Sequence, residues 1–352
     1  MIPDVALLLV ALVVILAGAE LFTNGIEWFG HHLELAEGAV GSVLAAVGTA
    51  LPETMIPVIA ILFATGEGSE EIGVGAVLGA PFMLATLAMF VTGAAVIARA
   101  RRGGSGSDLL LVDKAVLTHD LRFFAVCYAL AIAVAFVPAD IVVVRIAAAA
   151  TLIAIYGWYV KQHLDADADG DGSDLEPLRM RRLDRDGHRD DPGRPRLRIV
   201  NVQVVVALGC IVIGAYVFVD AVGGLAGSFG LDQALLALVI APIATELPEK
   251  FNSIIWVRAR KDTLALGNIT GAMVFQSAIP TVVALLFAGA AWSVSEGSIL
   301  AFASAGIAFA SVFAIFGLGR THELRGRRLL IGGGLYLVYL ALVVAQLSGV
   351  LD

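Results

Sequence analysis

Two short motifs place carboxylates inside long apolar stretches of the sequence. The first is Gly48-Thr-Ala-Leu-Pro-Glu53, and the second is Ala244-Thr-Glu-Leu-Pro-Glu249, which Lys250 follows directly. An ionised side chain at the centre of a bilayer costs at least about 2.5–3.5 kcal/mol of insertion free energy, so such acids are typical of a functional site. Both motifs therefore indicate chemistry that needs buried charge.

The residue types in each motif are those that bind a hard cation. A threonine and a glutamate stand four residues apart, which places them on one face of a helix. A proline inside a helix cannot donate to the carbonyl four residues before it, and here that carbonyl belongs to the first residue of the motif. Carboxylate, hydroxyl and carbonyl oxygens are the ligands that Ca²⁺ prefers. Together with Asn268, which is polar enough to line an ion path, the predicted cation ligands are Glu53, Glu249, Glu246, Thr49, Thr245, Gly48, Ala244 and Asn268.

A second interpretation of these residues needs no ion. Each proline would mark an ordinary helix kink, and each glutamate would be protonated or hydrogen-bonded within a bundle. Asn268 and Thr270 would then form hydrogen bonds between helices. Two glycine pairs with a spacing of four residues predict smooth helix faces that neighbouring helices approach closely; they are Gly75 with Gly79 and Gly267 with Gly271.

The composition is that of a membrane protein. Of 352 residues, 59% are hydrophobic and 15% are charged, and the mean hydropathy is +0.89, which excludes a soluble domain. The net charge of −8 comes with no basic patch interleaved with aromatic residues, so we expect no nucleic-acid partner. Cys127 and Cys210 lie in apolar spans and predict no disulfide. The sequence has no nucleotide-binding loop and no His-Glu-x-x-His motif, so we predict neither an enzyme nor a bound cofactor.

The expected fold is an all-α polytopic membrane protein with ten transmembrane helices. A polar segment at 164–198 divides the spans five and five. Most Lys and Arg residues lie in the loops after the third, fifth, seventh and ninth spans, which places these loops in the cytoplasm of a prokaryote and both termini outside the plasma membrane. The spans lie at about 4–26, 39–65, 72–99, 121–138, 140–162, 200–219, 231–257, 264–290, 296–318 and 328–349.

The two halves of the chain repeat each other. Glu249 follows Glu53 at an offset of 249 − 53 = 196 positions, and the same offset superposes segment 16–24 on segment 212–220. Five helices per half would insert the second half upside down relative to the first, as in secondary transporters. The predicted domains are 1–163, with its motif region at 39–90, a cytoplasmic loop at 164–198, and 199–352, with its motif region at 231–290.

The motifs, with Gly267-Asn-Ile-Thr-Gly271-Ala-Met-Val-Phe275, resemble the two repeats of the sodium/calcium exchanger family, within the cation/Ca²⁺ antiporter superfamily. That family typically has Gly-Thr-Ser-Leu-Pro-Glu, followed later by Gly-Asn-x-x-Gly-Ser-Asn/Asp-x-Phe. The resemblance covers nearly the whole chain. It implies that Glu53 and Glu249 are the central ligands of Ca²⁺ and Na⁺, with Thr49 and Thr245 beside them.

This sequence departs from the family pattern where sodium ligands are expected. Oxygen-bearing residues are replaced by Ala50, Ala76, Ala80, Pro81, Ala272 and Met273, whereas Glu246 adds a carboxylate. Lys250 lies four residues after Glu246, a spacing that favours an ion pair. We hypothesise that the Lys250 ammonium occupies the space of a coupling Na⁺. The alternative is that Lys250 reaches toward a carbonyl or a lipid headgroup.

The central loop contains a pattern similar to a calcium-binding EF-hand. Acids stand at positions 1, 3 and 5, glycine at 6 and glutamate at 12, although position 8 is glycine and a proline follows at once. An acidic linker is the alternative interpretation. The residues of the predicted calcium loop are Asp165, Asp167, Asp169, Asp171 and Glu176.

The function expected from these features is secondary-active antiport. Ca²⁺, or a related divalent cation, would exchange for Na⁺ or H⁺ by alternating access, with inorganic cations and the bilayer as the partners. Two alternatives remain open: a proton-coupled exchanger without sodium sites, and a membrane scaffold with a degenerate repeat that transports nothing. A monomer is compatible with the sequence, and the oligomeric state stays open.

Overall fold

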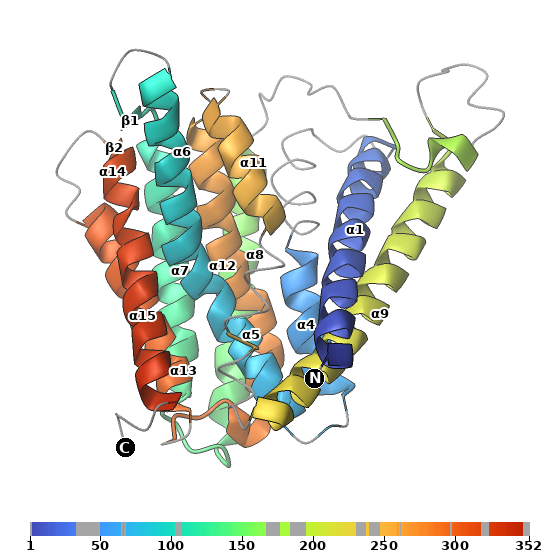
Figure 1. Cartoon of the computed structure of the whole chain (residues 1–352), viewed down its shortest axis with the longest axis vertical. Helices are drawn as coiled ribbons and strands as arrows, with labels where there is room; N and C mark the ends of the chain where they lie inside the picture. The colour runs from blue at the N-terminus through green and yellow to red at the C-terminus, as the bar shows by residue number, and fades with distance from the viewer. Residues whose placement is uncertain are drawn as a thin grey trace.

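The computed structural model describes residues 2–32, 50–64, 66, 68–102, 107–166, 177–183, 195–229, 237–238, 247–258, 260, 262–295, 298–317 and 324–347. Figure 1 shows these residues as a bundle of long helices, in which the start of the first helix and the end of the last lie at the same end. The elements are α1 (Ile2–His32), α4 (Leu51–Leu62), α5 (Ser69–Met83), η2 (Leu84–Ala88), α6 (Met89–Arg102), β1 (Leu109–Leu110), α7 (Lys114–Val134), α8 (Val142–Ala166), η3 (Arg181–Leu183), α9 (Leu197–Phe229), α11 (Leu247–Arg258), α12 (Asp262–Phe287), η4 (Gly289–Ala291), α13 (Ile299–Val312), η5 (Phe313–Gly317), β2 (Leu324–Arg325), α14 (Gly326–Leu329) and α15 (Ile331–Leu347).

Within the described residues, eight segments are long and apolar enough to cross a membrane. They coincide with eight of the ten spans expected from the sequence. The other two expected spans, 39–65 and 231–257, lie partly outside the described residues, and α4 and α11 are their described parts. The structure therefore shows a polytopic helical protein.

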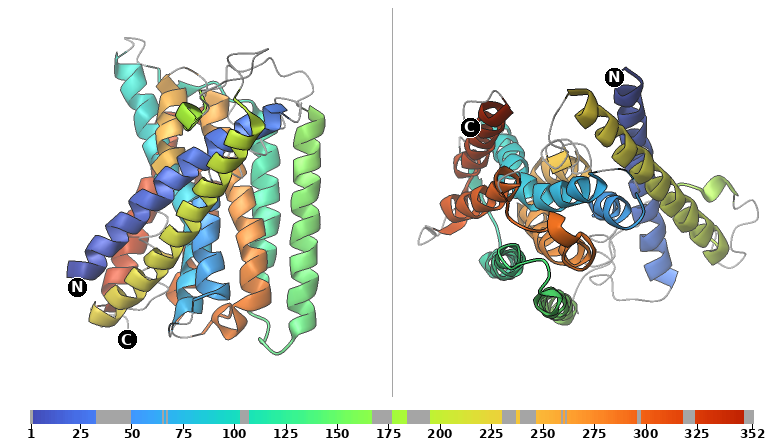
Figure 2. Two further views of the ribbon diagram at one scale, coloured as in Figure 1. Left: turned by 90° about the vertical axis from the view of Figure 1, so that its right-hand side faces the viewer. Right: turned by 90° about the horizontal axis from the view of Figure 1, so that it is seen from below.

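Helices α1 and α9 pack against each other as an antiparallel pair beside the rest of the bundle (Figure 1, Figure 2). A Cβ atom added at Gly18 would lie 2.9 Å from Ile211 Cγ1, and one added at Gly214 would lie 2.6 Å from Ile15 Cγ1. Adding 196 to the residue numbers of Gly18 and Ile15 gives Gly214 and Ile211, so the two contacts are equivalent in the repeat. Glycine at both places lets the helices meet closely.

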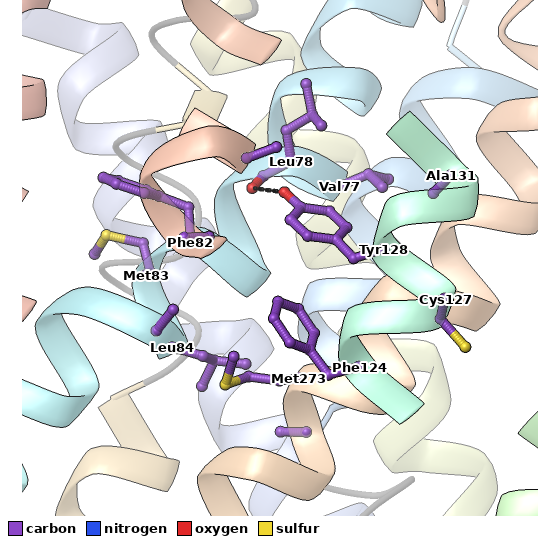
Figure 3. Close-up of a cluster of buried hydrophobic side chains, with 14 of the residues drawn as sticks. Val77, Leu78, Phe82, Met83, Leu84, Phe124, Cys127, Tyr128, Ala131 and Met273 are labelled. Carbon is purple, nitrogen blue, oxygen red and sulfur yellow. Dashed lines mark hydrogen bonds between the residues drawn. The ribbon is translucent and has the colours of Figure 1, made fainter. Parts of the chain in front are cut away.

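Helix α12 runs through the centre of the bundle and packs against α4, α5, α7, α8 and α11. The helix that begins at Ser69 continues to Arg102, but it widens to π geometry at η2, three residues after Pro81. The Ser311 hydroxyl of α13 donates to the Ala85 carbonyl of this turn at 2.6 Å. Figure 3 shows the apolar core beside it, where the Tyr128 hydroxyl donates to the Leu78 carbonyl at 3.3 Å.

A buried ion pair joins α6 to the start of α12. The Arg99 guanidinium donates to both carboxylate oxygens of Asp262, at 2.5 and 3.2 Å, and also to the Val257 carbonyl. The Leu111 N–H donates to the same carboxylate at 3.0 Å, next to the antiparallel pair of β1 and β2. These contacts tie the ends of helices from both halves of the chain together.

Candidate functional site

The Glu53 carboxylate is the best-placed of the predicted ligands. It lies in the first turn of α4 and is 5% exposed. The first turn of a helix carries partial positive charge from N–H groups that have no helical acceptor, and this stabilises an acid there. Glu53 is therefore a buried acid next to the N–H groups at the start of a helix.

The structure corrects the expected role of Pro52. Helix α4 begins at Leu51, after Ala50, so Pro52 lies in its first turn, where proline costs little. The interior proline of α4 is Pro57. Because it has no N–H, it cannot make the helical hydrogen bond to the Glu53 carbonyl, four residues earlier. In α4, the carbonyl that an interior proline leaves without a helical donor is thus that of Glu53.

Helix α11 contributes a buried cation. Lys250 lies in α11 and is 5% exposed. A lysine that reached a lipid headgroup would extend to the protein surface, so that part of the alternative for Lys250 is wrong. Glu249 stands one residue earlier in the same turn, and its side chain lies outside the described part of the structure.

Asn268 lies in α12, the helix against which both α4 and α11 pack. Its Nδ2 atom is buried and has no hydrogen-bond partner among the described residues. The two ends of an asparagine amide are assigned from hydrogen bonds, so a half-turn would put the Oδ1 acceptor in this place. An oxygen there would be a suitable cation ligand.

Several of the predicted cation ligands and most of the predicted calcium loop lie outside the described residues. These are Gly48, Thr49, Ala244, Thr245, Glu246, Asp167, Asp169, Asp171 and Glu176, together with the side chain of Asp165 at the end of α8. The described residues contain no group of three or more His, Cys, Asp or Glu side chains that could hold a metal ion.

The glycines of α12 do not serve close helix packing. A Cβ atom at Gly267 would meet no described atom within 4 Å, and one at Gly271 would meet only the Tyr159 hydroxyl, at 3.4 Å. The expectation of a tightly approached face was wrong at these two positions. Open space instead lies next to Gly267, one residue before Asn268.

The third helix offers few oxygen ligands, as its sequence departures imply. Ala76, Ala80 and Pro81 are all buried in α5. None of these side chains carries a polar atom, so α5 offers no side-chain ligand at these three positions.

A buried acid that the sequence reading missed lies on the other side of α12. Asp120 of α7 is 1% exposed, and its carboxylate accepts from the Thr270 hydroxyl at 2.6 Å and from the Tyr159 hydroxyl at 3.0 Å. His119 lies 3.9 Å from the same carboxylate. Thr270 therefore forms a hydrogen bond between helices, as one of the two interpretations held. The missed signal was an acid one residue before the expected span at 121–138.

Comparison with known proteins agrees with this architecture. The model of the sodium/calcium exchanger protein family matches residues 4–161 and 200–348, on either side of the polar central segment. CaxA of Alkalimonas amylolytica, which is named as an antiporter, is 35% identical over 74 residues, 21% of this chain and 23% of CaxA. An uncharacterized membrane protein of Methanocaldococcus jannaschii is 22% identical over 77% of this chain and 78% of its own length.

Solved exchanger structures have the same fold. The H⁺/Ca²⁺ exchanger CAX superposes with a TM-score of 0.70 at 14% identity, over 97% of this chain and 82% of that one. The sodium-calcium exchanger NCX_Mj superposes with a TM-score of 0.54 at 16% identity, over 97% and 98% of the two chains. Since the family model matches almost all of both halves, the chain belongs to the sodium/calcium exchanger protein family.

Proposed function

We propose that this protein is a secondary-active antiporter that exchanges Ca²⁺, or a related divalent cation, for Na⁺ or H⁺ by alternating access. The observation that carries the proposal is the buried Glu53 in the first turn of α4, in a chain of this family. The similar proteins, an H⁺/Ca²⁺ exchanger and a sodium-calcium exchanger, support the same class of cargo.

The proposed site lies between the start of α4 and helices α11 and α12. Glu53 and Glu249 supply carboxylates, and Asn268 supplies an amide oxygen. A divalent cation neutralises two buried carboxylates, and without it the ionised site is costly to bury. The protein therefore changes between its inward-open and outward-open states only with the divalent cation or its counter-ion bound, which makes transport an exchange.

The reciprocal contact between α1 and α9 supports an inverted repeat around this site. Two antiparallel helices whose contacts are equivalent after a fixed shift in residue number are related by a twofold axis perpendicular to both helices. In transporters built this way, the substrate site lies near the middle of the bilayer, between the repeats. We extend this relation from the α1–α9 pair to the two five-helix halves, 1–163 and 199–352.

The buried Lys250 favours protons over sodium as the coupling ion. Its ammonium brings a fixed positive charge to the start of α11, and α5 has alanine and proline at positions where relatives place oxygens. A site with fewer oxygens and a resident cation has less room for Na⁺. Protonation of the glutamates would then balance the departure of Ca²⁺.

Flux measurements in reconstituted vesicles test the proposal. Uptake of ⁴⁵Ca²⁺ is measured while the Na⁺ gradient and the pH gradient are varied independently. We expect uptake driven by an outward gradient of the counter-ion, with a pH gradient more effective than a Na⁺ gradient. A chain that moves no divalent cation under any gradient would be the non-transporting scaffold.

A further inference from the structure

A groove of about 600 Å³ runs between α6 and α11, with apolar side chains along it and arginines at one end. Its apolar wall on α6 is built from Phe90, Ala94 and Ala98, and Arg102 follows at the same spacing of four residues. On α11, Ile254 is followed by Arg258 at the same spacing. Each helix thus presents apolar side chains along the groove and an arginine at its end.

The arginines at the end of the groove are uncompensated. Arg102, Arg258 and Arg260 are exposed, and none of them pairs with a carboxylate in the described structure. Arg99, which also lines the groove, is already neutralised by Asp262. The groove therefore carries three positive charges over an apolar wall.

Arg260 is held in a backbone conformation that few side chains adopt. Its φ is 60°, and it is the only non-glycine residue of the described structure with a positive φ. Such a conformation is costly for a residue other than glycine or asparagine. The turn after α11 places the third arginine beside the other two at this cost.

We propose that the groove binds an anionic phospholipid from the leaflet at this end of the bundle. One acyl chain would lie on Phe90, Ala94 and Ala98, where the small alanines leave room. The phosphate would lie among Arg102, Arg258 and Arg260. The apolar wall favours a lipid over free phosphate, and three unpaired arginines favour an anionic headgroup over a zwitterionic one.

Such a lipid would join the two halves of the chain. Helix α6 belongs to the first half, and α11, which carries Glu249 and Lys250, belongs to the second. A bound lipid would stabilise the contact between them in the full-length protein. This inference does not depend on which ions the protein carries.

Thermal unfolding of the purified full chain in a non-ionic detergent tests the proposal. Phosphatidylglycerol and phosphatidylcholine with identical acyl chains are titrated, and the apparent affinity is taken from the rise in Tm. We expect phosphatidylglycerol to raise Tm and phosphatidylcholine to have little effect. Equal effects of the two lipids, or an equal rise with inorganic phosphate alone, would overturn the proposal.

Two sets of variants locate the site. The triple variant Arg102→Gln, Arg258→Gln and Arg260→Asn should weaken the apparent affinity on the order of 100-fold, since each arginine near a membrane surface contributes about fivefold. Asparagine is chosen at position 260 because it tolerates a positive φ. The matched control replaces three exposed arginines outside the groove, Arg101, Arg122 and Arg182, with glutamine and should retain wild-type affinity.

The apolar wall is tested separately with Ala98→Trp, which fills the groove and leaves its charge intact. This variant should lose the response to phosphatidylglycerol, while Ala98→Ser should keep it. If the tryptophan variant or the triple-arginine variant responds like the wild type, the lipid does not lie in this groove.

Discussion

Gly18 of α1 and Gly214 of α9 occupy equivalent places at one helix crossing. The space beyond Gly18 is filled by Ile211, and the space beyond Gly214 by Ile15. The nearest backbone oxygens exchange in the same way, because Gly18 faces the Ala207 carbonyl and Gly214 faces the Ala11 carbonyl. Adding 196 to each α1 residue of this crossing thus gives the α9 residue with the equivalent contact. Two apolar segments whose sequences match by chance would not pack in this reciprocal way.

Alanine at either of these glycines should destabilise the protein to a similar extent. Each new Cβ would overlap an isoleucine, and overpacking of this kind costs about 1–3 kcal/mol. Thermal unfolding in detergent should show a lower Tm for Gly18→Ala and for Gly214→Ala. Gly209→Ala on α9, where no described atom lies within 4 Å, is the control and should not lower Tm. A loss of stability in the control alone would contradict the crossing.

The buried Asp120 should be essential to the packing of α7 and α8 on α12. Asp120→Ala removes the acceptor of two buried hydroxyl groups and should destabilise by several times the roughly 1 kcal/mol of one ordinary hydrogen bond. Thr270→Val and Tyr159→Phe each remove one donor and should cost about 1–3 kcal/mol. A double-mutant cycle between Asp120 and Thr270 measures their coupling, and additive losses would show that they do not interact.

The ion pair between Arg99 and Asp262 should tolerate the loss of both partners better than the loss of one. The Asp262 side chain is 3% exposed, so Arg99→Met leaves a buried carboxylate without its cation, at a cost of about 3–5 kcal/mol. Arg99→Lys should rescue this only in part, because lysine cannot bind both oxygens side by side. The double variant with Asp262→Leu should recover stability in thermal unfolding. Arg327→Met, at an arginine whose side chain is 65% exposed and lies 3.5 Å from Asp108, provides the control and should have little effect on Tm.

Lys250 should decide which ion drives exchange. Lys250→Ser removes the fixed charge and adds an oxygen, so Ca²⁺ flux should become sensitive to a Na⁺ gradient in vesicles. Lys161→Ser, on the exposed end of α8, is the control. Strict Na⁺ dependence in the wild type would refute the proposed role of Lys250.

Most of the fold was predictable because transmembrane spans are long and apolar. Eight of the ten spans were predicted, most of their ends to within a few residues, although α9 continues to Phe229, well past the expected end at 219. Helix α7 begins at Lys114 rather than near 121, so Asp120 was left out of the bundle. An apolar window cannot recognise an acid whose hydrogen-bond partners come from distant helices.

The site was predictable in its residue types more than in its local geometry. Glu53 was predicted as a cation ligand from its motif, and the structure shows it as a buried acid in the first turn of α4. The proline argument failed because helix starts cannot be located from spacing: Pro52 lies in a first turn, and Pro57 is the interior proline. The glycine argument failed at Gly267 because a small residue can border open space as well as a neighbouring helix.

The most direct test of cation binding at the start of α4 is ⁴⁵Ca²⁺ flux by Glu53→Gln in reconstituted vesicles. Glutamine keeps the shape of the side chain and removes its charge, so we expect folded protein whose flux falls to the background of empty vesicles. Glu70→Gln, at an exposed acid in the first turn of α5, should transport like the wild type. Undiminished flux in Glu53→Gln would show that the buried glutamate of α4 does not bind the transported cation.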